Sequence, residues 1–204
     1  GTAGYTAMLC ILEIINKKIS PNDGMILVTG ATGGVGSFAV MILSKLGFSV
    51  VAATGKANQK KYLSELGAVE IIPRDIFSEP PKALEKEKWV GVVETVGSLT
   101  LSNACASTKY GGVVTSCGMA QGMKFTTSVA PFILRNITLS GIDSVYKSIS
   151  ERIEAWKKLS EILDEDSIKL ISSTIKLDEV NAYTKKMLNQ NIVGRVIVDM
   201  KNSL

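Results

Sequence analysis

The segment VTGATGGVGSFAVMILSKLG, residues 28–47, places four glycines within seven residues. A short apolar run precedes these glycines, and a run with the periodicity of a helix follows them. A helix N-terminus at that point offers free N–H groups and the positive end of the helix dipole, and a turn without side chains lets a pyrophosphate approach the backbone. The segment therefore predicts a nucleotide-binding turn between a strand and a helix, with a tight turn that holds no ligand as the alternative.

The fit of this turn to the dinucleotide-binding pattern G-x-G-x-x-G depends on its strand–turn–helix context. The first position is Ala31, so the letters read A-T-G-G-V-G. In this alignment Gly33 permits the approach of the pyrophosphate, and Gly36 permits close packing of the helix on the strand. Two other patterns fail. No tyrosine is followed by Lys four residues later, as in short-chain dehydrogenases, and no Gly precedes Lys-Ser or Lys-Thr, as in a P-loop.

Short apolar strands alternate with helices along the rest of the chain, which predicts βαβ units and a doubly wound parallel sheet of the α/β class. The first two strands are almost continuously apolar, as expected where helices cover both faces of a sheet. The predicted strands are 25–30, 49–54, 68–73, 89–94, 112–117, 136–142, 173–177 and 194–199. The predicted helices are 2–18, 34–46, 57–66, 99–109, 150–163 and 178–189. Because the chain starts with Gly1 inside a helical pattern, we expect it to be a piece of a longer protein.

The residues after the second predicted strand indicate which dinucleotide the turn would bind. NAD-binding domains place a carboxylate there for the ribose 2′-hydroxyl. No Asp or Glu occurs between residues 23 and 65, and the chain instead carries Thr54, Gly55 and Lys56 at this position. A hydroxyl, a free N–H and an ammonium attract a 2′-phosphate. The sequence therefore favours NADPH over NADH, with a solvated loop charge as the alternative for Lys56.

The composition narrows the chemistry further. The chain contains no histidine, which excludes histidine acid–base catalysis and histidine–zinc sites within it, so we assign no metal site and no catalytic residue. The net charge of +4 comes from scattered basic residues, which argues against a nucleic-acid surface. No apolar run reaches the roughly 18 residues that span a bilayer, so we expect no membrane segment. Three separated cysteines do not suggest a disulfide framework, so we expect a reducing, cytoplasmic compartment.

Nine blocks, distributed in order along nearly the whole chain, resemble one family. They are GTAGYTAML, VTGATGGVGS, the TGK turn, IPRDIF, ETVG, YGGVVTSCG, PFILRN, GIDSV and VGRVIV. They resemble the medium-chain dehydrogenase/reductase superfamily, within it the zinc-free quinone-oxidoreductase-like branch, and most closely the NADPH-dependent acryloyl-CoA reductases. The resemblance implies an NADP-binding Rossmann domain at residues 1–172 and a C-terminal return segment at 173–204 of an otherwise missing GroES-like domain. It also implies hydride transfer to the β-carbon of an activated alkene such as an enoyl-CoA thioester.

The resemblance implies cofactor-binding roles for individual residues. These are Thr32, Gly33, Gly34 and Val35 for the pyrophosphate; Thr54, Gly55 and Lys56 for the 2′-phosphate; Arg74 for the adenosine end; and Met119, Ile133, Ser144 and Asn189 for the nicotinamide and its amide. Simpler interpretations stay open for four of them: a surface ion pair for Arg74, core packing for Met119, a plain turn for Ser144 and a solvated helix terminus for Asn189. Cys117 has no histidine partner and follows an apolar strand, so we interpret it as a core thiol.

Three functions stay open from the sequence. The resemblance favours an NADPH-dependent reductase of enoyl-CoA thioesters. A quinone reductase and a non-catalytic NADPH-binding regulatory module are the alternatives, because no residue of this chain is a convincing proton donor. The strand predicted at 136–142 lies beyond the fifth strand signal, so we place it at a sheet edge, where unpaired backbone groups can pair with the same strand of a second copy. We therefore expect a homodimer.

Overall fold

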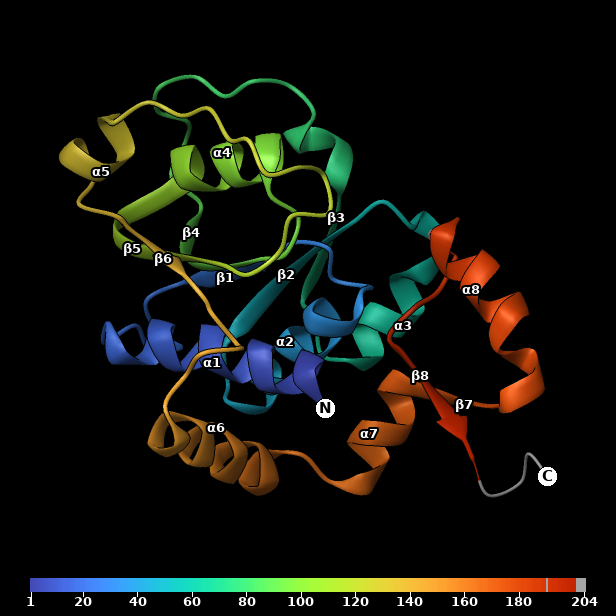
Figure 1. The fold of residues 1–204 in the computed structure, drawn as a ribbon. Coiled ribbons are helices and arrows are strands. Elements are labelled where there is room, and N and C mark those ends of the chain that lie inside the picture. Colours follow the sequence, from blue (N-terminus) through green and yellow to red (C-terminus); the bar gives the residue numbers. More distant parts are fainter. Residues whose placement is uncertain (190, 201–204) are drawn as a thin grey trace.

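The computed structural model describes residues 1–189 and 191–200. Its centre is a six-stranded sheet with the order β3-β2-β1-β4-β5-β6, in which every neighbouring pair is parallel (Figure 1). In this order the chain moves outward from β1 in one direction and then returns to build the other half, which is the doubly wound arrangement and confirms the predicted fold class. The strands are β1 (Met25–Val28), β2 (Ser49–Thr54), β3 (Glu70–Pro73), β4 (Trp89–Glu94), β5 (Thr108–Ser116) and β6 (Thr138–Gly141).

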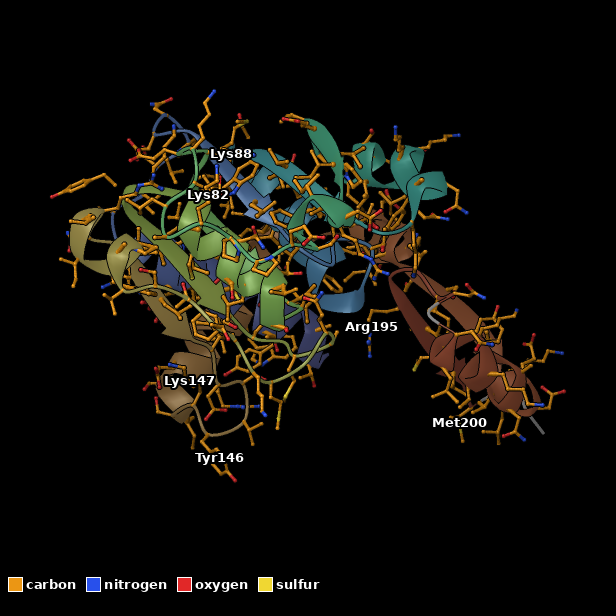
Figure 2. The ribbon with its side chains drawn as sticks, turned by 90° about the horizontal axis from the view of Figure 1, so that it is seen from above. Lys82, Lys88, Tyr146, Lys147, Arg195 and Met200 are labelled. Carbon is orange, nitrogen blue, oxygen red and sulfur yellow. The ribbon has the colours of Figure 1, made fainter. Side chains whose placement is uncertain are left out.

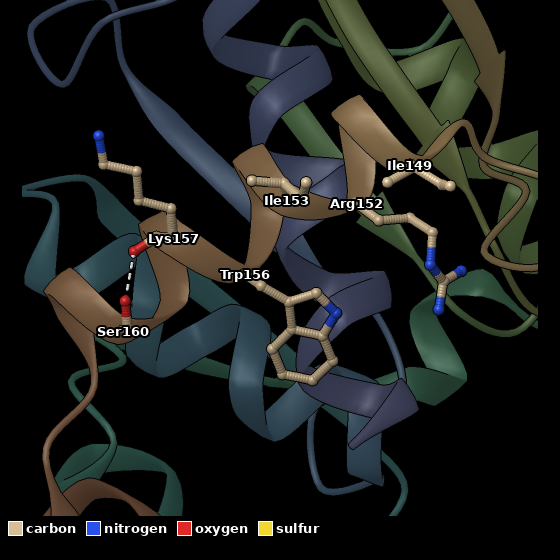
Figure 3. Close-up of a pocket in the computed structure, with 6 residues that line it drawn as sticks. All are labelled: Ile149, Arg152, Ile153, Trp156, Lys157 and Ser160. Atoms are coloured by element: carbon tan, nitrogen blue, oxygen red, sulfur yellow. Dashed lines mark hydrogen bonds between the residues drawn. The ribbon is translucent and has the colours of Figure 1, made fainter.

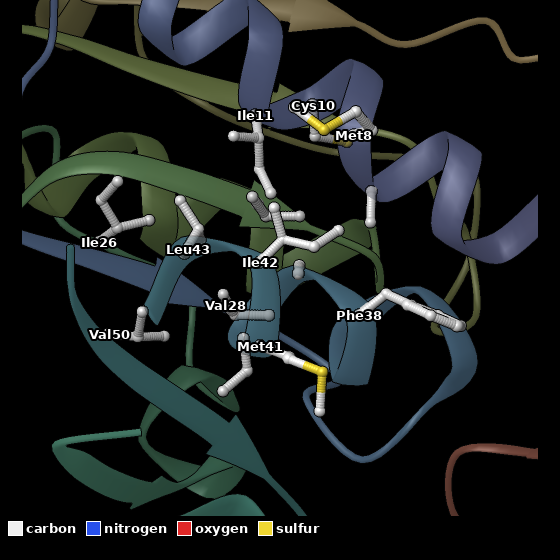
Figure 4. Packing of buried hydrophobic residues seen from close by; sticks show 14 of the residues in the cluster. Met8, Cys10, Ile11, Ile26, Val28, Phe38, Met41, Ile42, Leu43 and Val50 are labelled. Atoms are coloured by element: carbon white, nitrogen blue, oxygen red, sulfur yellow. The ribbon is translucent and has the colours of Figure 1, made fainter. Parts of the chain in front are cut away.

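Successive residues of the central strands face opposite layers of helices. Ile26 and Val28 of β1 pack into a cluster with α1 (Thr2–Asn16) and α2 (Gly34–Lys45), whereas Leu27 packs into a cluster with α4 (Ser98–Ser107). This alternation is the period of two of a strand, and the burial of both faces explains why β1 and β2 read as continuous apolar runs. Figure 4 shows the first cluster, between the helices and the sheet.

The helix α1 is buried along most of its length because helices flank it in addition to the sheet. It packs against α2 on one side and against α6 (Ile149–Ile162) on the other. From α6, Ala155 and Leu159 enter the shared core. The opposite side of α6 carries the exposed side chains of Ile149 and Ile153.

Two short helices, α5 (Ala130–Leu134) and α7 (Glu165–Ile171), were not predicted from the sequence. Each is too short to establish a hydrophobic period. The cap of α7 is the only signal for it, since the carboxylate of Asp164 accepts a hydrogen bond from the Ser167 N–H at 2.8 Å. The predicted helix at 57–66 divides into a 3₁₀ turn at Ala57–Gln59 and the helix α3 (Lys60–Glu65).

The last part of the chain forms a separate unit. The strands β7 (Ser172–Lys176) and β8 (Arg195–Asp199) pair in parallel in a two-stranded sheet of their own, connected through α8 (Val180–Leu188). No residue of α8 is buried. The strands β7 and β8 are therefore not part of the six-stranded sheet. The assignment of this unit to a second domain stays a prediction.

The two edges of the central sheet are β3 and β6. The edge position predicted for the strand at 136–142 is therefore confirmed, since β6 pairs only with β5 within the residues that the structure describes. No helix in this described part of the chain combines the length and the apolar character needed to cross a membrane.

Candidate functional site

The glycine-rich turn leaves the carboxyl end of β1 and enters α2 in a tight backbone path. Gly30 has a φ of +56°, a conformation that favours glycine, and its carbonyl accepts the Gly33 N–H at 2.8 Å. Gly33 is the N-cap of α2 and has no side chain to cap the helix. The first-turn N–H groups of Gly34, Val35 and Gly36 therefore have no intrahelical acceptor and face the turn. This arrangement can bind an anion.

The glycines of the turn differ in what surrounds them. A Cβ on Gly36 would lie 2.3 Å from the Gly30 carbonyl oxygen and 2.7 Å from the Ala31 Cα, so α2 approaches the turn after β1 as closely as the backbone allows. A Cβ on Gly33 would meet only the Gly30 oxygen, at 3.2 Å. Gly36 is therefore required by packing, as predicted. A Cβ on Gly33 would make one tight contact with the backbone and is otherwise unobstructed, so this glycine leaves the approach to the turn open.

The residues predicted for the 2′-phosphate gather at the end of β2. The hydroxyls of Thr32 and Thr54 are 3.2 Å apart, and the Lys56 N–H donates to the Thr54 hydroxyl at 3.1 Å. The Arg74 side chain, which follows β3, lies against Gly55, where an added Cβ would be 2.6 Å from its Nε. Within the described residues Arg74 forms no ion pair, so the alternative of a surface pair with Asp75 or Glu79 is not realised.

A segment of the C-terminal unit lies over this cluster, and the sequence analysis did not assign it a role. The Gly194 N–H donates to the Thr32 carbonyl at 2.9 Å, and the Lys56 ammonium donates to the Ile192 carbonyl. Partial burial lowers the pKa of Lys56. The Arg195 side chain lies against Gly34, whose Cβ would be 2.6 Å from the Arg195 Cδ. Figure 2 shows Arg195 at the junction between the C-terminal unit and the rest of the molecule. The block VGRVIV was the only sequence signal for this segment of the C-terminal unit.

The side chain of Glu94 joins the carboxyl ends of three strands. It ends β4 and is fully buried. One carboxylate oxygen accepts the Thr29 hydroxyl after β1 at 3.2 Å and the N–H groups of Val96 and Gly97 at 2.7 and 2.8 Å, and the other accepts the Ser116 hydroxyl of β5 at 3.4 Å. Burial raises the pKa of Glu94, and these hydrogen bonds oppose the shift. Glu94 therefore fixes the turns at this edge.

A cleft of about 540 Å³ opens beside Glu94, at the ends of β4, β5 and β6. Its lining includes Met119, which is 64% exposed and so is not a core residue. It also includes Cys117, which is only half-buried. Cys117 packs against the core cluster, in agreement with its interpretation as a core thiol, and in addition reaches the wall of the cleft. Ser144 follows Asp143, another residue of the lining, and its carbonyl accepts a hydrogen bond from the Arg152 guanidinium.

Two predicted residues are not brought to this cleft. Ile133 lies on α5 with its side chain exposed, and α5 leads into the amino end of β6. The neighbouring Arg135 carbonyl accepts the Gly111 N–H in the first half of β5, so α5 lies at the opposite end of the strands from the glycine turn. The predicted contact between Ile133 and the nicotinamide is not supported for this reason. Asn189 is exposed at the end of α8, and its role stays a prediction.

A second hollow, of about 570 Å³, lies on the exposed side of α6 (Figure 3). It is lined by Ile149, Ile153 and Trp156, whose ring stacks on Tyr5 with centroids 5.7 Å apart. All of its lining residues belong to the helix α6, and none comes from the strand ends. The candidate site is therefore the continuous edge from the end of β2 across the glycine turn to the cleft. No group of three or more Cys, Asp or Glu side chains in the described residues could hold a metal ion.

Comparison with known proteins gives a consistent result. Residues 34–165 match the zinc-binding dehydrogenase family. The chain is 44% identical, over 97% of its length, to the probable acrylyl-CoA reductase AcuI of Escherichia coli, and 41% identical, over 98%, to the putative quinone oxidoreductase YhfP of Bacillus subtilis. It spans 61% of each of these relatives.

Solved structures agree with these relatives. The yhdH oxidoreductase of Salmonella enterica, solved in complex with NADP, is 42% identical with a TM-score of 0.95; the aligned region covers 98% of this chain and 61% of that one. The Bacillus subtilis protein yhfP, solved with NAD bound, is 41% identical with a TM-score of 0.92 and the same coverage of both chains. The resemblance to the quinone-oxidoreductase-like branch and the acryloyl-CoA reductases is thereby confirmed.

The burial of Glu94 predicts a pH-dependent stability. Because its pKa is raised above the ordinary value of 4.5, the folded state binds the proton more tightly than the unfolded state, so the stability that Glu94 contributes falls as the pH rises from 4.5 through the raised pKa. Glu94→Gln keeps the shape and an acceptor oxygen and removes the charge. We expect the unfolding free energy of the variant, relative to wild type, to rise with pH over that range, by about 1.4 kcal/mol for each unit of the shift.

Urea unfolding at a series of pH values measures this difference. Glu70→Gln, an exposed carboxylate at the start of β3, is the control and should change stability by less than about 0.5 kcal/mol. A difference between Glu94→Gln and wild type that is the same at every pH would contradict the prediction.

Proposed function

Because this chain belongs to the zinc-binding dehydrogenase family of medium-chain dehydrogenases/reductases, we propose that it is the nucleotide-binding part of an NADPH-dependent reductase. The observation that carries the proposal is the cationic end of β2. The Arg74 side chain lies against Gly55 there, the next residue is Lys56, whose backbone N–H bonds to the Thr54 hydroxyl, and no acidic residue takes the position that would repel a 2′-phosphate. A relative solved with NADP supports the choice of NADPH over NADH. Because another relative was solved with NAD bound, this choice calls for a direct test.

The strand order supports an extended cofactor along the same edge. The end of β2, the turn after β1 and the cleft beside β4 and β5 follow one another across the sheet. Three strand spacings of about 4.8 Å separate β2 from β5, so the ends of these two strands lie about 14 Å apart, which suits an extended dinucleotide. In this arrangement the N-terminus of α2 and the guanidinium of Arg195 would hold the pyrophosphate between them.

The nicotinamide would occupy the cleft, where Met119 and Cys117 line the wall and Glu94 keeps the surrounding turns in place. The bound cofactor would supply a hydride, and the residues of this chain would orient it and exclude water. No side chain in the described residues is assigned as proton donor. The absence of histidine and of a metal-binding cluster among these residues does not fit a zinc site, so we route no step through zinc.

The substrate that we propose is an activated alkene conjugated to a thioester, as in an enoyl-CoA, which the names of the reductase relatives favour. Reduction of quinones is the second candidate, because a putative quinone oxidoreductase is almost as similar. A regulatory module that binds NADPH without turnover is the third. It would need the phosphate contacts but not the cleft that continues beyond them.

We further propose that the protein forms a homodimer through β6 and acts in the cytoplasm. The open edge of β6 supports the first proposal. The second is supported by three cysteines that are all free thiols, which suits a reducing compartment.

The cofactor proposal predicts a selective effect at Lys56. Lys56→Glu should weaken NADPH binding by roughly 10- to 150-fold, since a charge-assisted hydrogen bond is worth about 1.5–3 kcal/mol, and should affect NADH much less. Fluorescence titration with both cofactors measures this. Lys60→Glu, an exposed lysine on α3, is the matched control for the change of charge. Arg195→Met should weaken both cofactors alike, because the pyrophosphate is common to them. Equal losses for Lys56→Glu would remove Lys56 from the 2′-phosphate site.

The substrate proposal is tested on a chain extended to the length of the relatives. NADPH oxidation is followed with acryloyl-CoA, crotonyl-CoA and a small quinone. We expect turnover of the thioesters to exceed that of the quinone, and we expect the 204-residue chain alone to bind NADPH without turnover. Faster turnover of the quinone would favour the second candidate. Binding with no turnover of any substrate by the extended chain would favour the regulatory module.

The dimer proposal predicts that proline disrupts the outer side of β6. The Ile142 N–H bonds to β5, so the Leu139 N–H, three residues earlier, points away from β5 toward the open edge. Leu139→Pro removes this outward donor and should give a monomer in light scattering, whereas Leu139→Val keeps the donor and should remain a dimer. A monomeric wild-type protein would refute the proposed interface.

A further inference from the structure

One wall of the cleft is the turn that continues β5, residues 117–123. It carries Met119 and Met123, whose side chains line the cleft and are 64% and 83% exposed. Methionine side chains are unbranched and flexible, so their position over the cleft depends on the backbone that carries them. An interaction that fixes the backbone of this turn therefore also fixes this wall of the cleft.

The turn lies against the segment that leads from β4 into α4. The Gln121 N–H donates to the Val96 carbonyl at 2.7 Å. Gly97 and Gly122 form a parallel bridge, and a Cβ on Gly97 would lie 2.5 Å from the Gly122 carbonyl oxygen. The two backbones are therefore in direct contact, and a movement of the turn relative to α4 would break this bridge.

The side chain of Gln121 connects the turn to α4 itself. Its Oε1 accepts hydrogen bonds from the Thr100 N–H at 3.2 Å and from the Thr100 hydroxyl at 3.0 Å. Thr100 lies in the first turn of α4, where an N–H has no intrahelical acceptor, and the N-cap residue Gly97 has no side chain to supply one. Gln121 thus caps α4 from a segment 21 residues further along the chain.

The burial of Thr100 gives this cap its importance. Thr100 is only 5% exposed, so water replaces a lost acceptor poorly. A buried donor without an acceptor is costly, whereas an exposed one is not. Gln121 itself is exposed and does not belong to the lining of the cleft. Its effect on the cleft is therefore indirect, through the backbone that carries Met119 and Met123.

We propose that Gln121 is a positioning residue for the nicotinamide half of the cofactor. With the cap in place, the turn presents Met119 and Met123 to the nicotinamide in one arrangement. Without the cap, only a fraction of the molecules has this arrangement, and the apparent affinity falls by that fraction. The proposal rests on the proposed function, which places the nicotinamide in the cleft. The adenosine end, at the end of β2, does not sense Gln121.

Hydrogen exchange of the 204-residue chain without ligand tests the cap. Gln121→Met keeps the length of the side chain and removes the acceptor, whereas Gln121→Glu keeps an acceptor oxygen with a charge that suits a helix N-terminus. The amides of Gln121 and Gly122 are hydrogen-bonded within the described structure. We expect both to exchange faster in Gln121→Met and at the wild-type rate in Gln121→Glu.

Thr126→Met is the matched control for the new side chain, because Thr126 is exposed and does not line the cleft. It should leave the exchange of both amides unchanged. Wild-type exchange rates in Gln121→Met would overturn the proposal, and this result does not depend on the proposed function.

Calorimetric titration with two ligands tests the selectivity for the nicotinamide half. NADPH and 2′-phospho-ADP-ribose share the adenosine and pyrophosphate groups and differ in the nicotinamide. We expect Gln121→Met to weaken NADPH binding by about 2- to 10-fold, the equivalent of one hydrogen bond, and to leave the binding of 2′-phospho-ADP-ribose unchanged. Gln121→Glu should bind both ligands as wild type does. Equal losses for the two ligands, or no loss, would refute the role of Gln121.

Failure of the proposed function gives a different result, in the wild-type protein. Binding of neither ligand would refute the dinucleotide site, and equal affinity for the two ligands would refute the placement of the nicotinamide in the cleft. Either result also refutes a role of Gln121 toward the cofactor. A wild-type preference for NADPH that Gln121→Met retains in full would refute the role of Gln121 alone.

Discussion

The close contact between α2 and the turn that follows β1 determines the direction in which the rest of the candidate site faces. The helix approaches this turn so closely that a Cβ on Gly36 would lie 2.3 Å from the Gly30 carbonyl oxygen. This contact aims the first turn of α2, with its unpaired N–H groups, at the open edge of the sheet. The hydroxyl pair of Thr32 and Thr54 and the cations beyond β2 are useful only because the helix terminus beside them is fixed in this way.

The buried carboxylate of Glu94 holds the other half of the site edge in place, as the Gly36 contact holds the first half. Glu94 accepts hydrogen bonds from groups that follow β1 and β4 and from one residue of β5. Removing a charge from water is costly, and the hydrogen bonds offset only part of that cost. The cleft therefore depends on a residue that does not line it and that contributes order to its turns at some expense in stability.

The sequence predicts the fold well because the signals for it are local. Hydrophobic period and glycine punctuation identify the strands, and the order of strands and helices identifies the doubly wound sheet. It predicts β2 and β4 with the bounds that the structure has. The short helices α5 and α7 were not predicted, since neither is long enough to show a full apolar period.

The residues of the candidate site are predicted only where they adjoin a sequence motif. Arg195 reaches the turn after β1 from the far end of the chain through tertiary packing, so local patterns could not reveal it. For Ile133 a motif of the family predicts a contact with the nicotinamide; in the structure α5 leads into the amino end of β6, and the predicted contact stays a prediction.

The hydrogen bonds from Lys56 to Ile192 and from Gly194 to Thr32 join the C-terminal unit to the nucleotide edge. Lys56 is at once a predicted ligand of the phosphate and a donor to this unit. Any anion that takes a hydrogen bond from Lys56 changes the free energy with which the C-terminal strand pair is docked, and by thermodynamic reciprocity the docking changes the affinity for that anion by the same factor. Binding of an anion and docking of the C-terminal unit are thus linked equilibria, because both use the hydrogen bond of Lys56.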